Sequence, residues 1–399
     1  MRVAYLSADP GVPVFGTKGA SVHVQEVLRA FRARGDSVRL YAARTGEHVP
    51  PDLVDLPLVH VPVDGDHGGA AGSREERTAR REQRQAAASL AMATLVVDSD
   101  AELAYERYSL FSTALAEVTV ALGIPGVLEV NAPLIDEQAV HRHLVDGDAA
   151  LRTLRTQVGA ASVVACVSEP VAQWVRTHCP DAGAKVRVVP NGVNTRRIRP
   201  TVAPDDGDPV VLFVGTLKPW HGVEVLLDAA VLARETWRVR IVGDGPEGPA
   251  LAAQAERLGL EVDFRGAVVP DDIPAALDGA TVAVAPYPVL DGSGQYFSPL
   301  KIYEYAAAAL PVVASAVGQV PSIVQDGITG LLVRPSDPGS LAAAVDILVK
   351  DPARARAVGR AGRVMVETEH SWDAVLARVL TGIPRAGEAG HGRTRGAAA

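Results

Sequence analysis

Short apolar runs alternate with longer segments of helical period along almost the whole chain, and the alternation restarts near the middle. Each run has the length of a buried strand, and each gap can hold a crossover helix. This pattern is typical of parallel sheets covered by helices, because parallel neighbours need long connections. The expected strands of the first half are 2–7, 37–43, 57–62, 126–131, 162–168 and 186–190. Those of the second half are 209–215, 237–243, 262–266, 281–286, 311–315 and 330–333.

The restart predicts two doubly wound α/β domains of Rossmann-like type. A chain of 399 residues with 48% hydrophobic side chains has enough apolar material for two cores. We expect an N-terminal domain at 1–196 and a C-terminal domain at 210–370, joined by a turn-rich linker at 197–209. A helix at 371–384 is expected to pack back on the N-terminal domain. Residues 385–399 lack periodicity and are expected to be disordered.

Charge and cysteine content argue against several classes of function. The formal net charge is −8, which gives no electrostatic case for nucleic acid. The two cysteines, Cys166 and Cys179, lack the spacing of a zinc site or a disulfide framework. The chain enters a strand at once, without a leader, and no apolar run approaches a membrane span. We therefore expect a cytoplasmic protein without a nucleic-acid partner, and its oligomeric state stays open.

Open sheets bind ligands at the carboxyl ends of their strands, and two such sheets facing each other would form a cleft there. The loop after the first strand carries Gly16 and Gly19 ahead of an amphipathic helix. These glycines serve either a phosphate at the helix N-terminus or only a tight turn, and both interpretations stay open. Their spacing is not GxGxxG, which disfavours a nicotinamide site. His23 on the same helix positions or deprotonates an acceptor, or else is a histidine satisfied within the fold, the favoured alternative.

The second half carries more specific signals for a diphosphate. A strand, a glycine turn at Gly215 and a helix with Lys218 and His221 at its mouth form one candidate anion site. The segment 286–315 joins another strand to a helix through a loop rich in glycine and serine.

Ser298 and Pro299 predict the start of that helix, as cap and first helical residue. Lys301 then lies in the first turn, where a cation opposes the helix dipole unless an anion is bound. Glu304 follows on an otherwise apolar helix. It either pairs with a buried donor or accepts hydrogen bonds from ribose hydroxyls, and we favour the ribose.

Taken together, these segments resemble the GT4 family of retaining glycosyltransferases with the GT-B fold. The resemblance runs from residue 2 to about residue 380, and it rests on the order and spacing of motifs that are individually weak. The motifs are GTKGAS, VRVVPNGVNTRRIRP, VGTLKPWHG, VGDGPE, VDFRGAV, SPLKIYEYAAAALPVVAS, QDGITGLLV and HSWD. The resemblance implies two Rossmann-like domains around a central cleft and transfer of a sugar from a nucleotide diphosphate.

The resemblance also assigns residues to the donor. Glu304 matches the second glutamate of an E-x7-E motif, which holds the ribose. The backbone of Gly266, Ala267 and Val268 would meet the base. The full donor set that we expect is Gly16, Gly19, Gly215, Thr216, His221, Gly243, Gly266, Ala267, Val268, Gly294, Tyr296, Phe297, Ser298, Leu300 and Glu304. The expected catalytic set is Lys218, Lys301, His23, Asn131 and Glu129.

The chain departs from the family pattern at several of these positions. Tyr296 stands where the first glutamate of E-x7-E is expected, as in a branch with SPLK in place of the acidic loop. Thr216 and His221 replace the usual Arg and Lys, so Lys218 and Lys301 would have to neutralise the diphosphate. Near the place of a family histidine the chain has LEVNAP, a sequence that includes Glu129 and Asn131. These two side chains become candidates for the sugar or acceptor pocket, although a strand-end Asn is often a turn former.

The leading hypothesis is glycosyl transfer from a nucleotide sugar, with UDP favoured, to an acceptor hydroxyl or amine. The acceptor would be a small molecule or glycan in cell-surface or secondary-metabolite synthesis. The DSD sequence at 98–100 lies away from the strand-end turns, so we expect neither a metal nor another cofactor. One alternative is a non-catalytic protein that binds nucleotide sugars. Another is a GT-B enzyme of different chemistry, such as an epimerase or a cyclitol-coupling enzyme.

Overall fold

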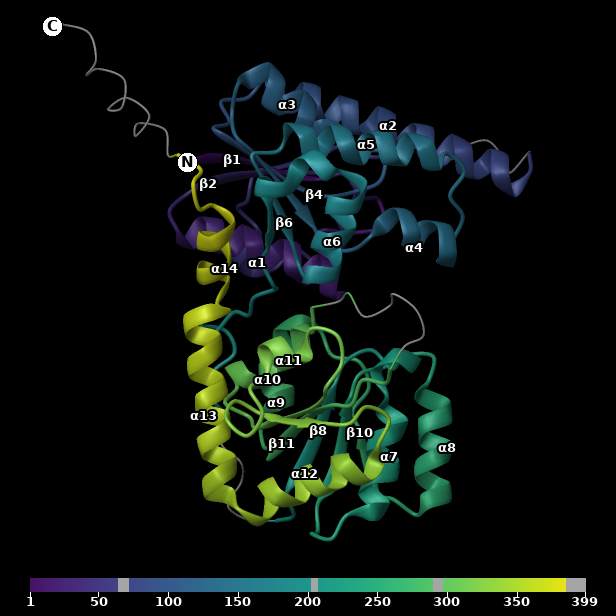
Figure 1. Cartoon of the computed structure of the whole chain (residues 1–399), viewed down its shortest axis with the longest axis vertical. Helices are drawn as coiled ribbons and strands as arrows, with labels where there is room; N and C mark the ends of the chain where they lie inside the picture. The colour runs from purple at the N-terminus through teal and green to yellow at the C-terminus, as the bar shows by residue number, and fades with distance from the viewer. Residues whose placement is uncertain (64–71, 202–206, 290–295, 297, 385–399) are drawn as a thin grey trace, which may run out of the picture. The chain divides into compact units, whose positions relative to one another are not determined.

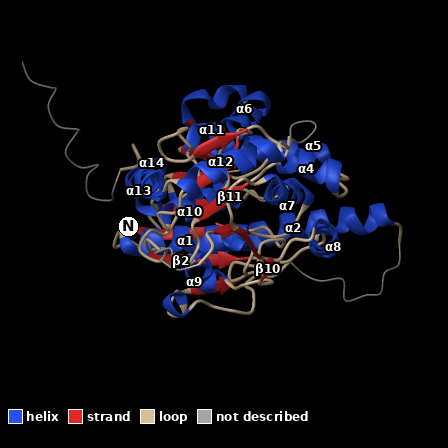
Figure 2. Ribbon diagram, turned by 90° about the horizontal axis from the view of Figure 1, so that it is seen from below, coloured by secondary structure: helices blue, strands red, loops and turns tan. Residues whose placement is uncertain are grey.

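A computed structural model describes residues 1–63, 72–201, 207–289, 296 and 298–384. The chain forms two compact units. The first consists of Met1–Pro190 together with the chain from Val375 onward, and the second is Asn191–Ala374. Within each unit helices and strands alternate along the chain, and Figure 2 colours the helices blue and the strands red. Both units are therefore of the α/β class that the alternation predicts.

The sheet of the first unit is parallel and has the strand order β3-β2-β1-β4-β5-β6-β7 (Figure 1). The sequence order reverses between β1 and β4, which is the point where sheets of this type open for ligands. The strands are β1 (Arg2–Ser7), β2 (Ser37–Ala42), β3 (Leu58–His60), β4 (Leu103–Arg107), β5 (Gly126–Val130), β6 (Val163–Cys166) and β7 (Val186–Val188). Every expected run of this half contains a strand, but β4 was not predicted.

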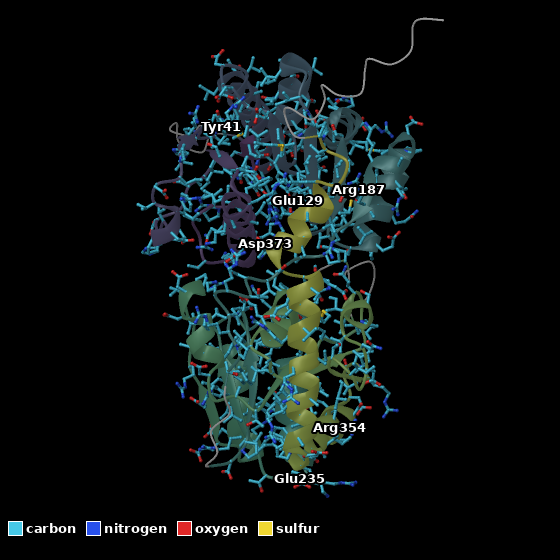
Figure 3. All side chains as sticks on the ribbon, turned by 90° about the vertical axis from the view of Figure 1, so that its left-hand side faces the viewer. Tyr41, Glu129, Arg187, Glu235, Arg354 and Asp373 are labelled. Atoms are coloured by element: carbon cyan, nitrogen blue, oxygen red, sulfur yellow. The ribbon has the colours of Figure 1, made fainter. Side chains whose placement is uncertain are left out.

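Helices of the first unit cover its sheet, and α3 contacts both α2 and α5 in one layer. They are α1 (Gly19–Ala33), α2 (Arg74–Val97), α3 (Ala114–Leu122), α4 (Leu134–His141), α5 (Gly147–Ala160), α6 (Glu169–His178) and α14 (Trp372–Val379), with short 3-10 turns η1 (Pro51–Leu53) and η2 (Pro180–Lys185). Most of α14 belongs to this unit. Nη1 of Arg187, a residue of β7 that Figure 3 labels, donates to Thr381 O over 2.6 Å, which holds the segment after α14 against the first sheet.

The sheet of the second unit is also parallel, with the order β10-β9-β8-β11-β12-β13. The order reverses between β8 and β11, so this sheet has its own ligand-binding switch point. The strands are β8 (Val210–Val214), β9 (Arg238–Val242), β10 (Val262–Phe264), β11 (Val282–Ala285), β12 (Val312–Ser315) and β13 (Leu331–Val333). Each lies within a run that the sequence predicts.

Two apolar clusters pack against the faces of this second sheet. One includes Tyr303 and Tyr305 of α10, and the other includes Leu226 of α7 and Leu341 of α12. The helices are α7 (Val223–Leu232), α8 (Gly248–Leu258), α9 (Ile273–Leu277), α10 (Leu300–Ala307), α11 (Val320–Ile323), α12 (Pro338–Lys350) and α13 (Pro352–Glu369), with 3-10 turns η3 (Pro219–His221) and η4 (Pro270–Asp272).

The boundary between the units differs from the expected one. The sequence placed the end of the N-terminal domain at residue 196, whereas the first unit ends at Pro190. Ile198 is fully buried in the core of the second unit, and Arg363 on α13 donates to the backbone oxygens of Thr195 and Ile198. The first residues of the expected linker therefore pack as part of the second unit, although their sequence is rich in turn-forming residues. The expected tail at 385–399 lies outside the described residues.

Candidate functional site

Three glycines form a linked edge at the carboxyl ends of β8, β9 and β10. Gly215 N donates to Val242 O over 2.9 Å, and Gly243 N donates to Gly266 O over 2.7 Å. Gly215 and Gly243 have φ of 146° and 143°, where L side chains are strained. A Cβ on Gly243 would collide with the carbonyl oxygen of Gly215, whereas one on Gly266 would meet nothing within 4 Å. Close packing therefore accounts for Gly243, while Gly266 presents an open face.

Lys301 reaches this edge from α10, the helix that follows β11. Its side chain is 92% buried, and Nζ lies 4.3 Å from the ring centroid of Phe213 and 5.1 Å from that of Tyr287. Nζ is 3.1 Å from the position that a Cβ on Gly215 would take. Among the described residues it has no hydrogen-bond partner. The ammonium group of Lys301 thus lies at the switch point between β8 and β11, in contact with two aromatic faces.

Burial lowers the pKa of Lys301 to about 7, although the carboxylate of Glu304 acts in the opposite direction. Glu304 is half-buried, three residues further along α10. A bound anion beside Nζ would restore the ordinary pKa, because the charged form would then have a partner.

The start of α10 differs from the prediction. We expected Ser298 to cap the helix and Pro299 to be its first residue, but the helix begins at Leu300, and Pro299 occupies the cap position without a side-chain hydrogen bond. The hydroxyl of Ser298 instead accepts from Asn191 N over 3.2 Å. The first turn of α10 therefore has no side-chain cap. Because Ile302 N donates to Pro299 O over 3.1 Å, the N–H groups left for a ligand are those of Leu300 and Lys301.

Lys218 and His221 lie at the end of β8, around η3. His221 Nδ1 is hydrogen-bonded to Thr216 O, and its ring lies 5.8 Å from that of Phe213 and 6.0 Å from that of Tyr287. Burial and the nearby Lys301 lower the pKa of His221 to about 3, so His221 adds no positive charge at neutral pH. Lys218, by contrast, is partly exposed, with Nζ 5.6 Å from the Trp220 ring centroid.

The remaining donor candidates fall into three groups. Gly266 and Ala267 are exposed after β10, and Val268 packs against the adjoining core. Leu300 is the first residue of α10. Tyr296 is described, whereas two candidates of the preceding loop lie outside the described residues: Gly294 and Phe297.

The first unit contains a buried polar cluster at the carboxyl ends of β4 and β5. Glu129 is 7% exposed (Figure 3), and its Oε1 lies 2.6 Å from Nε2 of His23 on α1. Tyr105 OH donates to the same oxygen over 3.0 Å, and Nη1 of Arg107 lies 3.9 Å from Oε2. Oε2 has no hydrogen-bond partner among the described residues, and neither has Nδ2 of Asn131.

This environment decides the charge of Glu129. Burial by itself would raise the pKa of its carboxyl group, but His23, Arg107 and the Tyr105 hydroxyl beside it together lower that pKa to about 2. Glu129 is therefore a carboxylate at any physiological pH and a weak base. It can orient a hydroxyl group, while its hydrogen bond occupies Nε2 of His23.

Gly16 has a structural reason to be glycine. A Cβ there would lie 2.8 Å from Ser21 Oγ and 2.9 Å from Pro13 Cγ, and Gly16 N closes a turn on Pro13 O over 2.9 Å. Gly19 is the first residue of α1, whose cap residue Lys18 makes no side-chain cap hydrogen bond. The tight-turn interpretation thus accounts for Gly16, while the start of α1 stays open to a ligand.

Tyr105 and Arg107 are site residues that sequence analysis missed, because LAYER carries two charged side chains and was not recognised as a strand. The alternation of Leu103, Tyr105 and Arg107 was the available signal. In the described part of the chain, no group of three or more His, Cys, Asp or Glu side chains is placed to hold a metal ion. No helix of that part has the length and apolarity needed to cross a membrane.

Two parallel α/β units, each with polar groups at the carboxyl ends of its strands, place the chain in the class of GT-B glycosyltransferases. Sucrose-phosphate synthase from Thermosynechococcus elongatus has the same fold (TM-score 0.67, 22% identity, covering 95% of this chain and 97% of that one). HepE from Anabaena, solved in complex with UDP, also shares it (TM-score 0.66, 19% identity, covering 96% and 100%).

The chain belongs to glycosyltransferase family 4. Residues 17–197 match the model of Glycosyltransferase Family 4, and residues 208–351 match that of Glycosyl transferases group 1. Alpha-maltose-1-phosphate synthase of Mycolicibacterium smegmatis is 30% identical over 95% of this chain and 98% of its own length. D-inositol 3-phosphate glycosyltransferase of Segniliparus rotundus is 28% identical over 95% and 88%. The chain is therefore a glycosyltransferase, as the sequence predicts.

Proposed function

We propose that the protein transfers a sugar from a UDP-sugar, bound by the second unit, to an acceptor bound by the first. The observation that carries this proposal is Lys301. A buried ammonium without a hydrogen-bond partner among the described residues is costly, and an anion beside it removes the cost. Lys301 lies in the first turn of a helix without a side-chain cap, so charge and N–H groups favour the same ligand.

The pyrophosphate of the donor is the anion that fits. Its β-phosphate would form an ion pair with Lys301 and accept hydrogen bonds from the first N–H groups of α10. Lys218 would be a second, more exposed cation near the pyrophosphate. During transfer the bond from the sugar C1 to the phosphate oxygen breaks, and its electron pair stays on the departing UDP. The acceptor oxygen forms the new bond to C1, and its proton passes to the departing phosphate oxygen of UDP. Groups that are in place before charge develops lower the barrier to this departure.

The nucleoside would extend along the glycine edge of the second sheet. Glu304 accepts hydrogen bonds from the two ribose hydroxyls in this proposal, and the exposed backbone at Gly266 and Ala267 meets the base. The positive groups would neutralise the leaving group without a metal or other cofactor. Retention of the anomeric configuration and the SPLK branch, with Tyr296 in place of a glutamate, rest on the resemblance to the family.

The acceptor would bind at the polar cluster of the first unit, where Glu129 and Asn131 hold a hydroxyl group. The two relatives are named for phosphorylated small molecules, which favours a small-molecule acceptor over a glycan. Cell-surface or secondary-metabolite synthesis stays the proposed context. The thiols of Cys166 and Cys179 are free and buried, which is compatible with the reducing cytoplasm as the proposed location.

A donor screen tests the proposal. UDP, GDP and their glucose conjugates are titrated into the protein by calorimetry, and slow hydrolysis of the bound sugar is followed by release of UDP. We expect UDP to bind and UDP-glucose or another UDP-sugar to be hydrolysed by wild type. Lys301→Met should lose both, and Lys350→Met, at an exposed lysine on α12, should lose neither. Binding without turnover by any donor would favour the non-catalytic alternative, and no binding of any nucleotide would refute the proposal.

A further inference from the structure

The two stretches of chain that join the units are paired with each other. The chain enters the second unit at Asn191 and leaves it after Ala374. Val193 N donates to His370 O over 2.8 Å, and Val193 and Ser371 form a parallel bridge. The entering and leaving stretches are therefore held to each other by backbone hydrogen bonds.

The entering stretch is also fastened to the start of α10. Asn191 N donates to Ser298 Oγ over 3.2 Å, and Asn191 Nδ2 donates to Ser298 O over 3.3 Å. Both residues are buried. The first residue of the second unit thus holds the residue two positions ahead of the helix that carries Lys301.

The leaving stretch contacts the same helix. The rings of His370 and Tyr303 lie 4.8 Å apart, and Tyr303 is fully buried. The hydroxyl of Tyr303 lies 3.4 Å from that of Ser298, so the contact between Asn191 and Ser298 and the contact between His370 and Tyr303 adjoin each other. The paired connection is therefore attached to α10 at two points, one on each stretch.

The fastening at Ser298 has a chemical consequence for the anion site. A serine just ahead of a helix ordinarily caps it, and its oxygen occupies one of the N–H groups that a phosphate would need. Asn191 engages both the hydroxyl and the carbonyl of Ser298, which holds this serine one position ahead of the cap, and the cap position falls to Pro299, whose side chain has no hydrogen-bonding group.

We propose that Asn191 is a positioning residue that keeps the N-terminus of α10 open for the pyrophosphate and couples its occupancy to the paired connection between the units. The inference rests on the proposed donor site for its ligand. An anion at α10 fixes the first turn, and the two fastenings transmit that order to residues 191–201 and to the end of α13. His370 has the same role on the leaving stretch.

Hydrogen exchange of the full-length, ligand-free protein tests the positioning. Asn191→Ala and Ser298→Ala each remove one of the two hydrogen bonds. Each should speed exchange in α10 about five-fold, the factor for a hydrogen bond of about 1 kcal/mol. Asn194→Ala is the matched control, since Asn194 lies on the same stretch and its Oδ1 accepts from Arg196 N and Arg197 N of that stretch rather than holding Ser298. Unchanged exchange of α10 in both variants, or an equal change in the control, would overturn the inference.

UDP tests the coupling. In wild type and in the control, UDP should slow exchange in residues 191–201 as well as in α10. In Asn191→Ala, UDP should still protect α10, but the protection of residues 191–201 should be lost. Equal protection in the variant and in wild type would refute the coupling. If calorimetry shows no UDP binding by wild type, the proposed donor site fails together with the coupling. Binding without protection of 191–201 overturns the coupling alone.

Discussion

Replacing Lys301 by methionine should stabilise the ligand-free protein while destroying its donor site. Methionine retains the apolar stem between Phe213 and Tyr287 but removes the buried charge. The pKa of Lys301 falls from 10.5 to about 7. At about 1.4 kcal/mol per pH unit, this difference corresponds to a free-energy cost of at most about 5 kcal/mol for keeping Lys301 charged in the folded protein.

The pH dependence has a defined sign. Below pH 7 Lys301 is protonated in the folded and the unfolded chain, so the full cost is present. Between pH 7 and 10.5 the unfolded chain binds a proton that the folded one lacks, so wild-type stability rises with pH. The advantage of Lys301→Met should therefore be largest below pH 7 and should fall by about 1.4 kcal/mol per unit above it.

Urea unfolding at pH 6, 7, 8 and 9 measures this difference. Because Lys301 also lowers the pKa of His221, the values at pH 8 and 9, where an imidazole is neutral, isolate the titration of Lys301. Lys350→Met is the control, since Lys350 is exposed and lies 3.7 Å from Glu235. Calorimetry of UDP binding at pH 8, in buffers of different ionisation enthalpy, should show uptake of a proton by wild type and by Lys350→Met, whereas Lys301→Met should not bind UDP. A stability difference that stays constant from pH 6 to 9 would refute the assignment of a buried, anion-seeking ammonium.

Three further predictions follow from the two sites. Glu304→Gln should weaken UDP binding about ten-fold, as for a lost charge-assisted pair, with unchanged circular dichroism; an unaltered Kd would exclude the ribose role. Gly243→Ala should lower the free energy of unfolding by more than about 2 kcal/mol, because the added Cβ would collide with the backbone of Gly215. Gly266→Ala should lower it by only about 1 kcal/mol, because its added Cβ meets no atom and only the backbone conformation is strained. Equal losses for the two variants in urea unfolding would contradict the packing argument. Glu129→Gln should remove about 3 kcal/mol at neutral pH, the effect of lowering its pKa from 4.5 to about 2. That contribution is complete above pH 4.5 and is lost as the pH falls toward 2, so a variant with the same acid unfolding curve as wild type would disprove it.

Apolar periodicity was sufficient for most of the fold, because buried parallel strands must be apolar on both faces. It failed at β4, where Glu106 is buried and accepts from Leu115 N over 2.7 Å at the start of α3. A charged residue with such a partner can lie inside a sheet, and a single sequence does not reveal the partner.

The site was predictable where local chemistry decides and not where distant residues meet. The position of Lys301 in the first turn of α10 followed from the sequence. The uncapped state of that helix did not, because it depends on Asn191, which lies 107 residues from Ser298. In the same way, the pairing of His23 with Glu129 spans 106 residues and fixes the charge of the carboxylate. Roles that depend on such pairs emerge only from the folded chain.

The bridge between Val193 and Ser371 means that the second unit begins and ends at neighbouring points, while the first is assembled from two separated pieces. The coding region of the second unit can therefore be exchanged as one continuous segment. A chimera that takes residues 191–374 from one family member and the remainder from another would need only two adjoining junctions to match. With the donor on the second unit and the acceptor on the first, as proposed, such a chimera would combine the donor preference of one family member with the acceptor preference of the other.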